Sequence, residues 1–185
     1  MTETVTLVGA GPGGAELLTR GGGAALRQAD AVVYDRLVDE SILDLIPKGA
    51  ERICVGKKMG HHPVPQDEIN ALLVRLARQG KRTVRLKGGD CYLFGRGGEE
   101  CEYLKAHGVP FRVLPGVTSA LAAPAFAGIP VTHRDFCSSV HIVTAHARAE
   151  KPLCIDFEAL VRTGGTLVFL MGLTALRPVE DGLAA

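Results

Sequence analysis

The stretch LVGAGPGGAE, residues 7–16, decides how the start of this chain is interpreted. Three of its glycines have the spacing G-x-G-x-x-G, at Gly9, Gly11 and Gly14. An apolar run typical of a buried strand, Val5–Val8, precedes the loop, and Asp35 closes the next apolar run about 20 residues further on. This order of strand, glycine loop and acidic residue is that of a turn that binds a dinucleotide.

The residues that follow the loop argue against a dinucleotide site. A true fingerprint needs a helix that begins at the loop and runs on without interruption. Three successive glycines, Gly21–Gly23, would each cost up to about 1 kcal/mol relative to alanine inside a helix. We therefore expect a break there and a helix over Ala24–Gln28. Pro12 also removes an amide donor from the loop. A glycine-rich turn that needs positive φ explains the loop better than a FAD- or NAD-dependent oxidoreductase does.

The composition limits the class of protein. The 185 residues are 46% hydrophobic and 22% charged, as in ordinary globular proteins, and the net charge of +1 provides no field for nucleic acid or membrane partners. The five cysteines contain no C-x-x-C pair, which favours reduced thiols over disulfides or a metal site. No signal peptide is recognisable, and no apolar run approaches the ~18 residues of a membrane span. These features predict a cytoplasmic protein without a metal.

Short apolar runs alternate with segments of helical spacing, which predicts an α/β fold with largely parallel sheets. The runs read as strands are Val5–Val8, Ala31–Tyr34, Arg52–Val55, Thr83–Leu86, Phe111–Leu114, Val140–Thr144 and Thr166–Met171. The segments with helical spacing are Gln66–Gln79 and Gly98–His107. Chain breaks at Pro115-Gly116 and Gly128–Pro130 place a domain boundary near Leu114. We thus expect domains over 1–113 and 114–185, the second with few strands and C-terminally truncated.

Polar residues and glycines follow several of the predicted strands, where open α/β sheets bind ligands. Asp35 suits a general base or a hydrogen-bond anchor, although a lone aspartate at such a place is commonly a helix cap. Gly88 and Gly89 in LKGGD let backbone approach a ligand closely. The cations of VGKKMGHHP suit an anionic ligand or a solvated turn. Glu99 and Glu100 open a predicted helix, where the helix dipole favours acids, so we expect a structural role for both.

Seven segments carry a resemblance to a known family. In chain order they are LVGAGPG, YDRLV, VGK, LKGGD, FGRGGEE, PGVTSA and AGIPVTHR. Together they resemble the uroporphyrinogen-III C-methyltransferases of the tetrapyrrole methylase family, from Thr6 to about Leu173. The resemblance implies a two-domain α/β tetrapyrrole methylase fold, each domain a mostly parallel sheet with flanking helices and the second one incomplete here. It also implies a homodimer and S-adenosyl-L-methionine as the methyl donor.

The implied reaction methylates uroporphyrinogen III at C2 and C7 and gives precorrin-2, which leads to sirohaem and cobalamin. The alternative is a truncated member that binds a tetrapyrrole or the cofactor without turnover. The resemblance implies that Asp35 is a proton acceptor and Lys57 a proton donor. It implies cofactor contacts at Pro12, Gly88, Gly89, Asp90, Leu93, Thr118, Ser119 and Met171.

A tetrapyrrole that carries many carboxylates needs a local cationic patch, because the chain as a whole is nearly neutral. The candidates for this patch are Arg36, Lys57, Lys58, His61, His62, Lys87, Arg96 and Arg134. Two positions depart from the family pattern: Gly14 stands where aspartate is common, and Cys91 where proline is common. Loss of that proline enlarges the unfolded ensemble, which destabilises the fold by about 0.4–1 kcal/mol.

Overall fold

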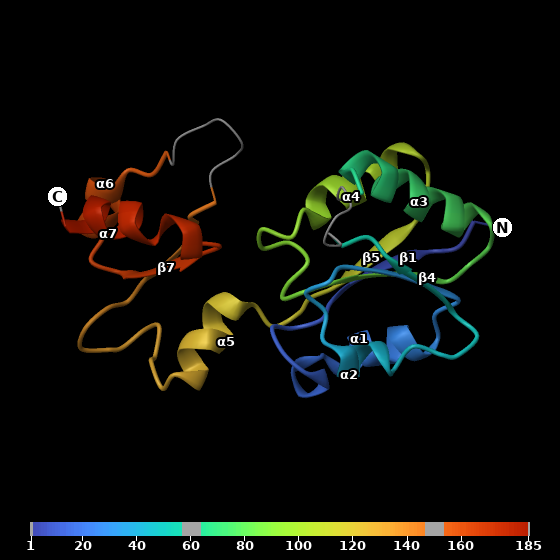
Figure 1. Ribbon diagram of the computed structural model, residues 1–185, viewed down its shortest axis with the longest axis horizontal. Coiled ribbons are helices and arrows are strands. Elements are labelled where there is room, and N and C mark those ends of the chain that lie inside the picture. Colours follow the sequence, from blue (N-terminus) through green and yellow to red (C-terminus); the bar gives the residue numbers. More distant parts are fainter. Residues whose placement is uncertain (1, 57–63, 147–153, 185) are drawn as a thin grey trace. The chain divides into compact units, whose positions relative to one another are not determined.

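A computed structural model describes residues 2–56, 64–146 and 154–184 of the chain (Figure 1). The chain divides into two compact units, Met1–Ser119 and Ala120–Ala185. No helix among the described residues is long and apolar enough to cross a membrane.

The first unit is built on a five-stranded sheet with the order β3-β2-β4-β1-β5. Its strands are β1 Val5–Gly9, β2 Ala31–Tyr34, β3 Glu51–Cys54, β4 Thr83–Lys87 and β5 Phe111–Leu114. All four pairings are parallel, and the first residues of β1 and β4, Val5 and Thr83, are in register. The expected α/β class with a parallel sheet is therefore confirmed.

Helices cover both faces of this sheet (Figure 1). Helices α1 Arg20–Arg27 and α2 Glu40–Leu43 lie on one face, and α3 Gln66–Arg78 and α4 Gly97–Ala106 on the other. The chain leaves β1 toward α1 and leaves the adjacent β4 toward α4, so the two connections pass over opposite faces. The topological switch point thus lies between β1 and β4, the place where open α/β sheets bind ligands.

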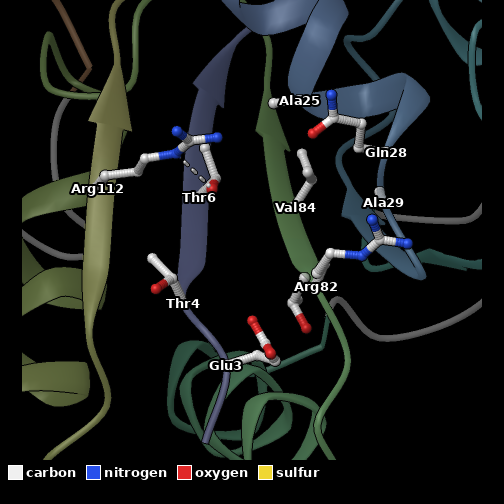
Figure 2. Close-up of a pocket in the computed structure, with 10 residues that line it drawn as sticks. Glu3, Thr4, Thr6, Ala25, Gln28, Ala29, Arg82, Val84 and Arg112 are labelled. Atoms are coloured by element: carbon white, nitrogen blue, oxygen red, sulfur yellow. Dashed lines mark hydrogen bonds between the residues drawn. The ribbon is translucent and has the colours of Figure 1, made fainter.

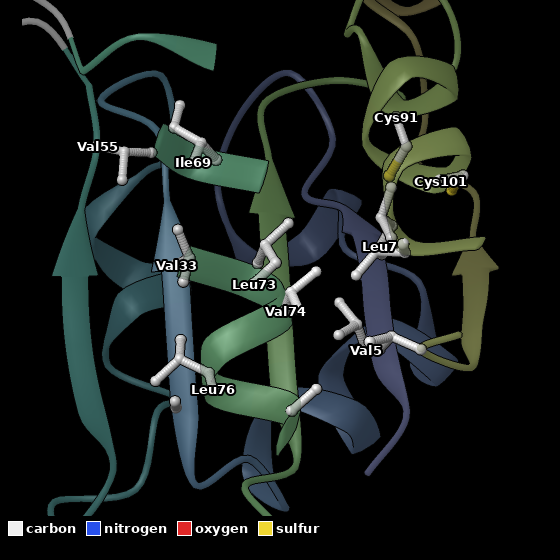
Figure 3. Packing of buried hydrophobic residues seen from close by; sticks show 14 residues of the cluster. Val5, Leu7, Val33, Val55, Ile69, Leu73, Val74, Leu76, Cys91 and Cys101 are labelled. Carbon is white, nitrogen blue, oxygen red and sulfur yellow. The ribbon is translucent and has the colours of Figure 1, made fainter. Parts of the chain in front are cut away.

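Each face of the sheet has its own hydrophobic core, because successive strand residues point to opposite sides. On the α3–α4 side, Leu7 and Val33 pack with Leu73 of α3 (Figure 3). On the other side, Val8 and Leu26 belong to the core formed with α1 and α2. Burial on both faces explains the nearly continuous apolar runs of β1 and β2.

The expected helix break at Gly21–Gly23 is wrong, because all three glycines lie inside α1. The helix is capped by Thr19, whose Oγ1 accepts a hydrogen bond from the Gly22 N–H at 3.1 Å. A Cβ atom on Gly22 would lie 2.9 Å from Cγ1 of Val8. Gly22 therefore lets α1 approach β1 closely, and this packing outweighs the low helix propensity of glycine at that position. A short 3₁₀ helix, η1 Ala15–Leu17, separates the glycine loop from α1.

The second unit contains a two-stranded parallel sheet of β6 Val140–Thr144 and β7 Thr166–Leu170. The connection between them includes helix α6 Phe157–Arg162, and η2 Leu173–Ala175 and α7 Leu176–Ala184 follow β7. Helix α5 Ser119–Phe126 follows β5 and begins where the units divide. Every residue of β6 and β7 is half-buried, so this sheet lacks the fully buried strands of the first unit.

Candidate functional site

Three glycine-containing loops meet backbone to backbone at the carboxyl ends of β1, β4 and β5. Gly11 and Gly89 exchange two hydrogen bonds, with N···O distances of 3.1 and 2.8 Å. A Cβ atom on Gly116 would lie 2.7 Å from Cα of Gly9, so this approach leaves no room for a side chain. Gly89 has φ +66°, and a Cβ atom there would meet no atom of the described residues within 4 Å. The space next to the Gly89 Cα atom, where a side chain would begin, is therefore open at the switch point.

The carboxylate of Asp90 ties two of these loops together. Its Oδ1 accepts hydrogen bonds from the N–H groups of Tyr92 and Leu93, at 2.8 and 3.1 Å. Its Oδ2 accepts one from the N–H of Gly116 at 3.0 Å. Asp90 therefore holds the loop after β4 against the loop after β5, and its side chain is engaged in shaping the site.

Asp35 lies directly after β2, which neighbours β4 in the sheet. Its side chain is 28% exposed, and Oδ1 accepts a hydrogen bond from Nη2 of Arg85 at 2.8 Å. The Arg85 side chain is only 2% exposed. Burial lowers the pKa of Arg85, but the carboxylates of Glu100 and Asp35 outweigh this effect and hold that pKa above its ordinary value. Asp35 thus presents a carboxylate with a permanent cation behind it.

Behind Arg85 lies a buried polar cluster that the strand and helix patterns did not predict. Oε1 of Glu100, on α4, accepts from Arg85 Nε at 2.9 Å, from Lys87 Nζ at 2.9 Å and from Gln66 Nε2 at 3.2 Å. Glu100 is fully buried, and its Oε2 has no hydrogen-bond partner among the described residues. The sequence predicts that Glu100 interacts with the helix dipole. It does lie in the first turn of α4, but its hydrogen-bond partners are buried side chains from other elements. Lys87 is 4% exposed and paired with Glu100, so its assignment to an exposed cationic patch is wrong.

Most of the remaining predicted cofactor contacts follow the same strands. Pro12 is exposed in the loop after β1, and Gly88 is half-buried after β4. Leu93 lies in the same loop as Gly88, whereas Thr118 and Ser119 follow β5 and are half-buried. The strands that carry these loops, β4, β1 and β5, are adjacent in the sheet. Only the fold could show this adjacency, because the loops are far apart in sequence.

Two predicted site residues belong to the second unit. Met171 directly follows β7, is 51% exposed and has φ +58°, a left-handed backbone that is uncommon for a residue with a side chain. Arg134 is exposed in the segment between α5 and β6.

The predicted substrate cations differ in how they are held. Arg36 is exposed directly after Asp35. Arg96 has φ +58° and pairs with Glu99, its Nε lying 3.0 Å from Oε1. Four further candidates, Lys57, Lys58, His61 and His62, lie outside the described residues.

The two departures from the family pattern have different structural settings. Gly14 has φ −70°, so its backbone does not require glycine, and a Cβ atom there would meet the flexible carboxylate of Glu16. Cys91 is fully buried in the core on the α3–α4 side. Burial and the nearby charge of Asp90 raise the pKa of the Cys91 thiol to about 12. This thiol is therefore a core group.

A pocket of the first unit with polar lining residues lies away from these loops. It has a volume of about 230 Å³ and lies at the amino ends of β1, β4 and β5 (Figure 2). There Nε of Arg112 donates a hydrogen bond to Oγ1 of Thr6 at 3.0 Å, and Arg82 is occupied by a forked ion pair with Asp30. The candidate site and this pocket are thus at opposite ends of the strands.

Comparison with known proteins identifies relatives along the whole chain. The family described as Tetrapyrrole (Corrin/Porphyrin) Methylases matches residues 4–185. The chain is 55% identical over 179 residues to the porphyrin biosynthesis protein HemD of Ruminiclostridium josui, covering 97% of this chain and 36% of that protein. It is 53% identical over 184 residues to the siroheme synthase of Pseudomonas aeruginosa (strain LESB58), covering 100% of this chain and 39% of that protein. The chain thus spans well under half the length of these curated relatives.

Solved structures share the fold. The uroporphyrin-III C-methyl transferase from Thermus thermophilus, complexed with S-adenyl homocysteine, superposes with a TM-score of 0.80 at 42% identity and covers 98% of this chain and 71% of its own. The cobalt precorrin-4 methyltransferase superposes with a TM-score of 0.85 at 30% identity and covers 98% of this chain and 74% of its own. These findings confirm the resemblance carried by the sequence motifs.

Proposed function

Because the chain belongs to the tetrapyrrole (corrin/porphyrin) methylases, we propose that it transfers methyl groups from S-adenosyl-L-methionine to uroporphyrinogen III. The proposed methylation at C2 and C7 gives precorrin-2, for sirohaem or cobalamin biosynthesis. Relatives named for porphyrin and siroheme synthesis, and a solved methyltransferase at 42% identity, support this assignment. As in the family resemblance, we propose a cytoplasmic homodimer.

One observation carries the proposal: Asp35 is a partly exposed carboxylate at a strand end, held from behind by a buried arginine. When a pyrrole carbon accepts a methyl cation, the macrocycle becomes positively charged and must lose a proton. A carboxylate in its ionised form can accept that proton. Arg85 keeps the carboxylate oriented and leaves its second oxygen for the substrate. Lys57 is proposed as the proton donor from the family resemblance.

The residues at the switch point fit the methyl donor. Gly89 has open space on the side where a Cβ atom would lie, so a ligand can approach its backbone. When bound, S-adenosyl-L-methionine supplies a methyl group that is electrophilic because its sulfur is positively charged. The residues proposed to hold it are Pro12, Gly88, Gly89, Asp90, Leu93, Thr118, Ser119 and Met171. Their main contribution is alignment of the two reactants, which can lower a barrier by roughly 7–11 kcal/mol.

The carboxylates of the macrocycle require cations outside the cofactor site. The residues proposed for this task are Arg36, Lys58, His61, His62, Arg96 and Arg134. Arg96 is already paired with Glu99, so substrate binding there would exchange one carboxylate for another.

The test is methyl transfer by the chain itself. Uroporphyrinogen III and S-adenosyl-L-methionine are supplied under anaerobic conditions, and the product is oxidised and measured by its fluorescence. Asp35→Asn should lower kcat roughly 10²–10⁴-fold, the usual contribution of a positioned proton acceptor. The dissociation constant for S-adenosylhomocysteine, measured by calorimetry, should stay within about twofold, because Asp35 is proposed to act on the macrocycle.

Asp44→Asn is the matched control, because Asp44 is an exposed aspartate at the end of α2 with no role in the proposal. An unchanged kcat in Asp35→Asn would remove Asp35 from the mechanism. Binding of S-adenosylhomocysteine without any methyl transfer would favour a cofactor-binding module without turnover. Absence of both would contradict the proposed function.

A further inference from the structure

Asp35, the proposed proton acceptor, is hydrogen-bonded to Arg85, and other groups in turn fix the position of Arg85. Arg85 uses all three guanidinium nitrogens: Nη2 on Asp35 at 2.8 Å, Nε on Glu100 at 2.9 Å, and Nη1 on the Leu86 carbonyl at 3.2 Å. Because the guanidinium is planar, fixing Nε and Nη1 also fixes the direction in which Nη2 points. The orientation of the Asp35 carboxylate therefore depends on the group that holds Nε.

That group is Glu100, and its surroundings are unusual for a residue kept for stability. Three donors converge on Oε1, while Oε2 is buried without a partner among the described residues. A buried polar atom without a partner is unfavourable, and buried ion clusters are frequently no more stabilising than apolar packing. Such an exception in a native fold calls for a reason other than stability.

Charge balance around Arg85 supplies that reason. Arg85 and Lys87 are two cations with side chains at most 5% exposed, and Glu100 pairs with both. Without the charge of Glu100, the carboxylate bonded to Arg85 among the described residues would be that of Asp35 alone. Both carboxylate oxygens of Asp35 would then be attracted to Arg85. With Glu100 charged, Arg85 binds one oxygen of Asp35, and the other is left to accept a proton from the substrate.

We propose that Glu100 is a positioning residue for the methyl-transfer reaction: it anchors Arg85, and Arg85 in turn sets the place and orientation of the Asp35 carboxylate. Glu100 acts only through Arg85 and touches no reacting atom. This inference rests on the proposed function for its kinetic consequence, but the coupling between Glu100 and Asp35 is a property of the ligand-free protein.

The kinetic test uses Glu100→Gln, which removes the charge and keeps the shape. Its kcat should fall roughly 10–100-fold, as expected for a misplaced catalytic group. KM for S-adenosyl-L-methionine and the affinity for S-adenosylhomocysteine should stay within about threefold. In the Asp35→Asn background the same substitution should have no further effect on kcat, because the group that Glu100 positions is gone. Glu102→Gln, an exposed glutamate on the same helix, is the matched control.

Glu100→Asp keeps the test decisive if Glu100→Gln does not fold. It retains the charge on a shorter side chain, so it should fold and show a smaller loss of kcat that again disappears in the Asp35→Asn background. A kcat equal to that of the parent in the folded Glu100 variants would overturn the inference. So would a loss that multiplies with that of Asp35→Asn, because this would place Glu100 outside the Arg85–Asp35 connection.

A second measurement needs no turnover. In ligand-free protein labelled with ¹³Cγ-aspartate, the signal of Asp35 is the one that Asp35→Asn removes. This signal should move in Glu100→Gln or Glu100→Asp and stay in place in Glu102→Gln. An unmoved signal in the Glu100 variants would contradict the inference. If the parent chain transfers no methyl group, the proposed function fails, whereas this measurement still decides whether Glu100 positions Asp35.

Discussion

At the scale of the residue, the three carboxylates at the switch-point end of the sheet have three different settings. Asp90 is taken up by backbone N–H groups, Glu100 by buried cations, and Asp35 by one arginine with part of its surface open. Only Asp35 leaves a carboxylate oxygen for a substrate. The same chemical group thus fixes a loop at Asp90, compensates buried charge at Glu100 and is proposed to act in catalysis at Asp35. The role of each carboxylate is therefore set by the groups that it is bonded to.

Cys91 gives a prediction about alkaline pH. The unfolded chain releases the thiol proton near the ordinary pKa of 9.0, whereas the folded protein keeps it to about pH 12. Between these values the unfolded state binds fewer protons, so stability falls as pH rises, by about 1.4 kcal/mol at pH 10 for this one group. Urea unfolding at pH 8 and pH 10 should therefore show a loss that is smaller in Cys91→Ala by about this amount.

Cys154→Ala is the control, because Cys154 is exposed and should leave the alkaline loss unchanged. Equal losses in the parent and in Cys91→Ala would show that the thiol ionises alike in the folded and unfolded states.

The residue scale also shows which site residues could be predicted. Asp35 and Gly89 follow predicted strands, so their place at a ligand-binding edge is a matter of chain order. Glu100 could not be predicted, because a glutamate in the first turn of a helix is usually exposed. Its burial depends on α4 packing on the face of the sheet to which Arg85 and Lys87 point. The available sequence signal was Arg85 and Lys87, two cations two residues apart in a predicted buried strand, which need a buried counter-charge.

At the scale of the element, helix α1 shows a local preference overruled by packing. Gly21 is exposed, and a Cβ atom there would lie 3.8 Å from Leu114, an ordinary contact. Gly21→Ala should therefore stabilise the protein by about 0.5–1 kcal/mol through helix propensity. At Gly22 the added atom would lie 2.9 Å from Val8, so Gly22→Ala should destabilise by about 1–3 kcal/mol through overpacking.

Urea unfolding of the two variants makes a matched pair, because the same chemical change is made one residue apart. Stabilisation by both substitutions would mean that α1 does not approach β1 as closely as described. The strand and helix spans themselves were largely predictable, since apolar periodicity determines them locally. The glycine run was misjudged because propensity is local whereas the close approach to Val8 is not.

At the scale of the whole molecule, the two units differ in how completely they bury their sheets. Strands β1 and β4 are buried along their length between helical layers, whereas every residue of β6 and β7 is half-buried. Two-stranded sheets are marginally stable by themselves. In the 185-residue chain we expect amide hydrogens of β6 and β7 to exchange at least about 10²-fold faster than those of β1 and β4.

Hydrogen exchange followed by mass spectrometry measures this difference within one sample, so the first unit serves as the internal standard. Comparable protection of all four strands would show that the second unit is stabilised by contacts beyond its own sheet. The surface of that unit includes large exposed side chains, Phe126 at 75%, Phe136 at 82% and Leu173 at 94%, which fits lower local stability.

The sequence by itself determined the α/β class, the spans of most strands and the family, because each depends on local periodicity or on short motifs in a set order. It also placed Asp35 and the glycines at strand ends. Only the tertiary structure decided that β4 lies between β1 and β2, and so brings Arg85 to Asp35 and Gly89 to Gly11. Strand order depends on long-range packing against helices on both faces, which no local pattern encodes.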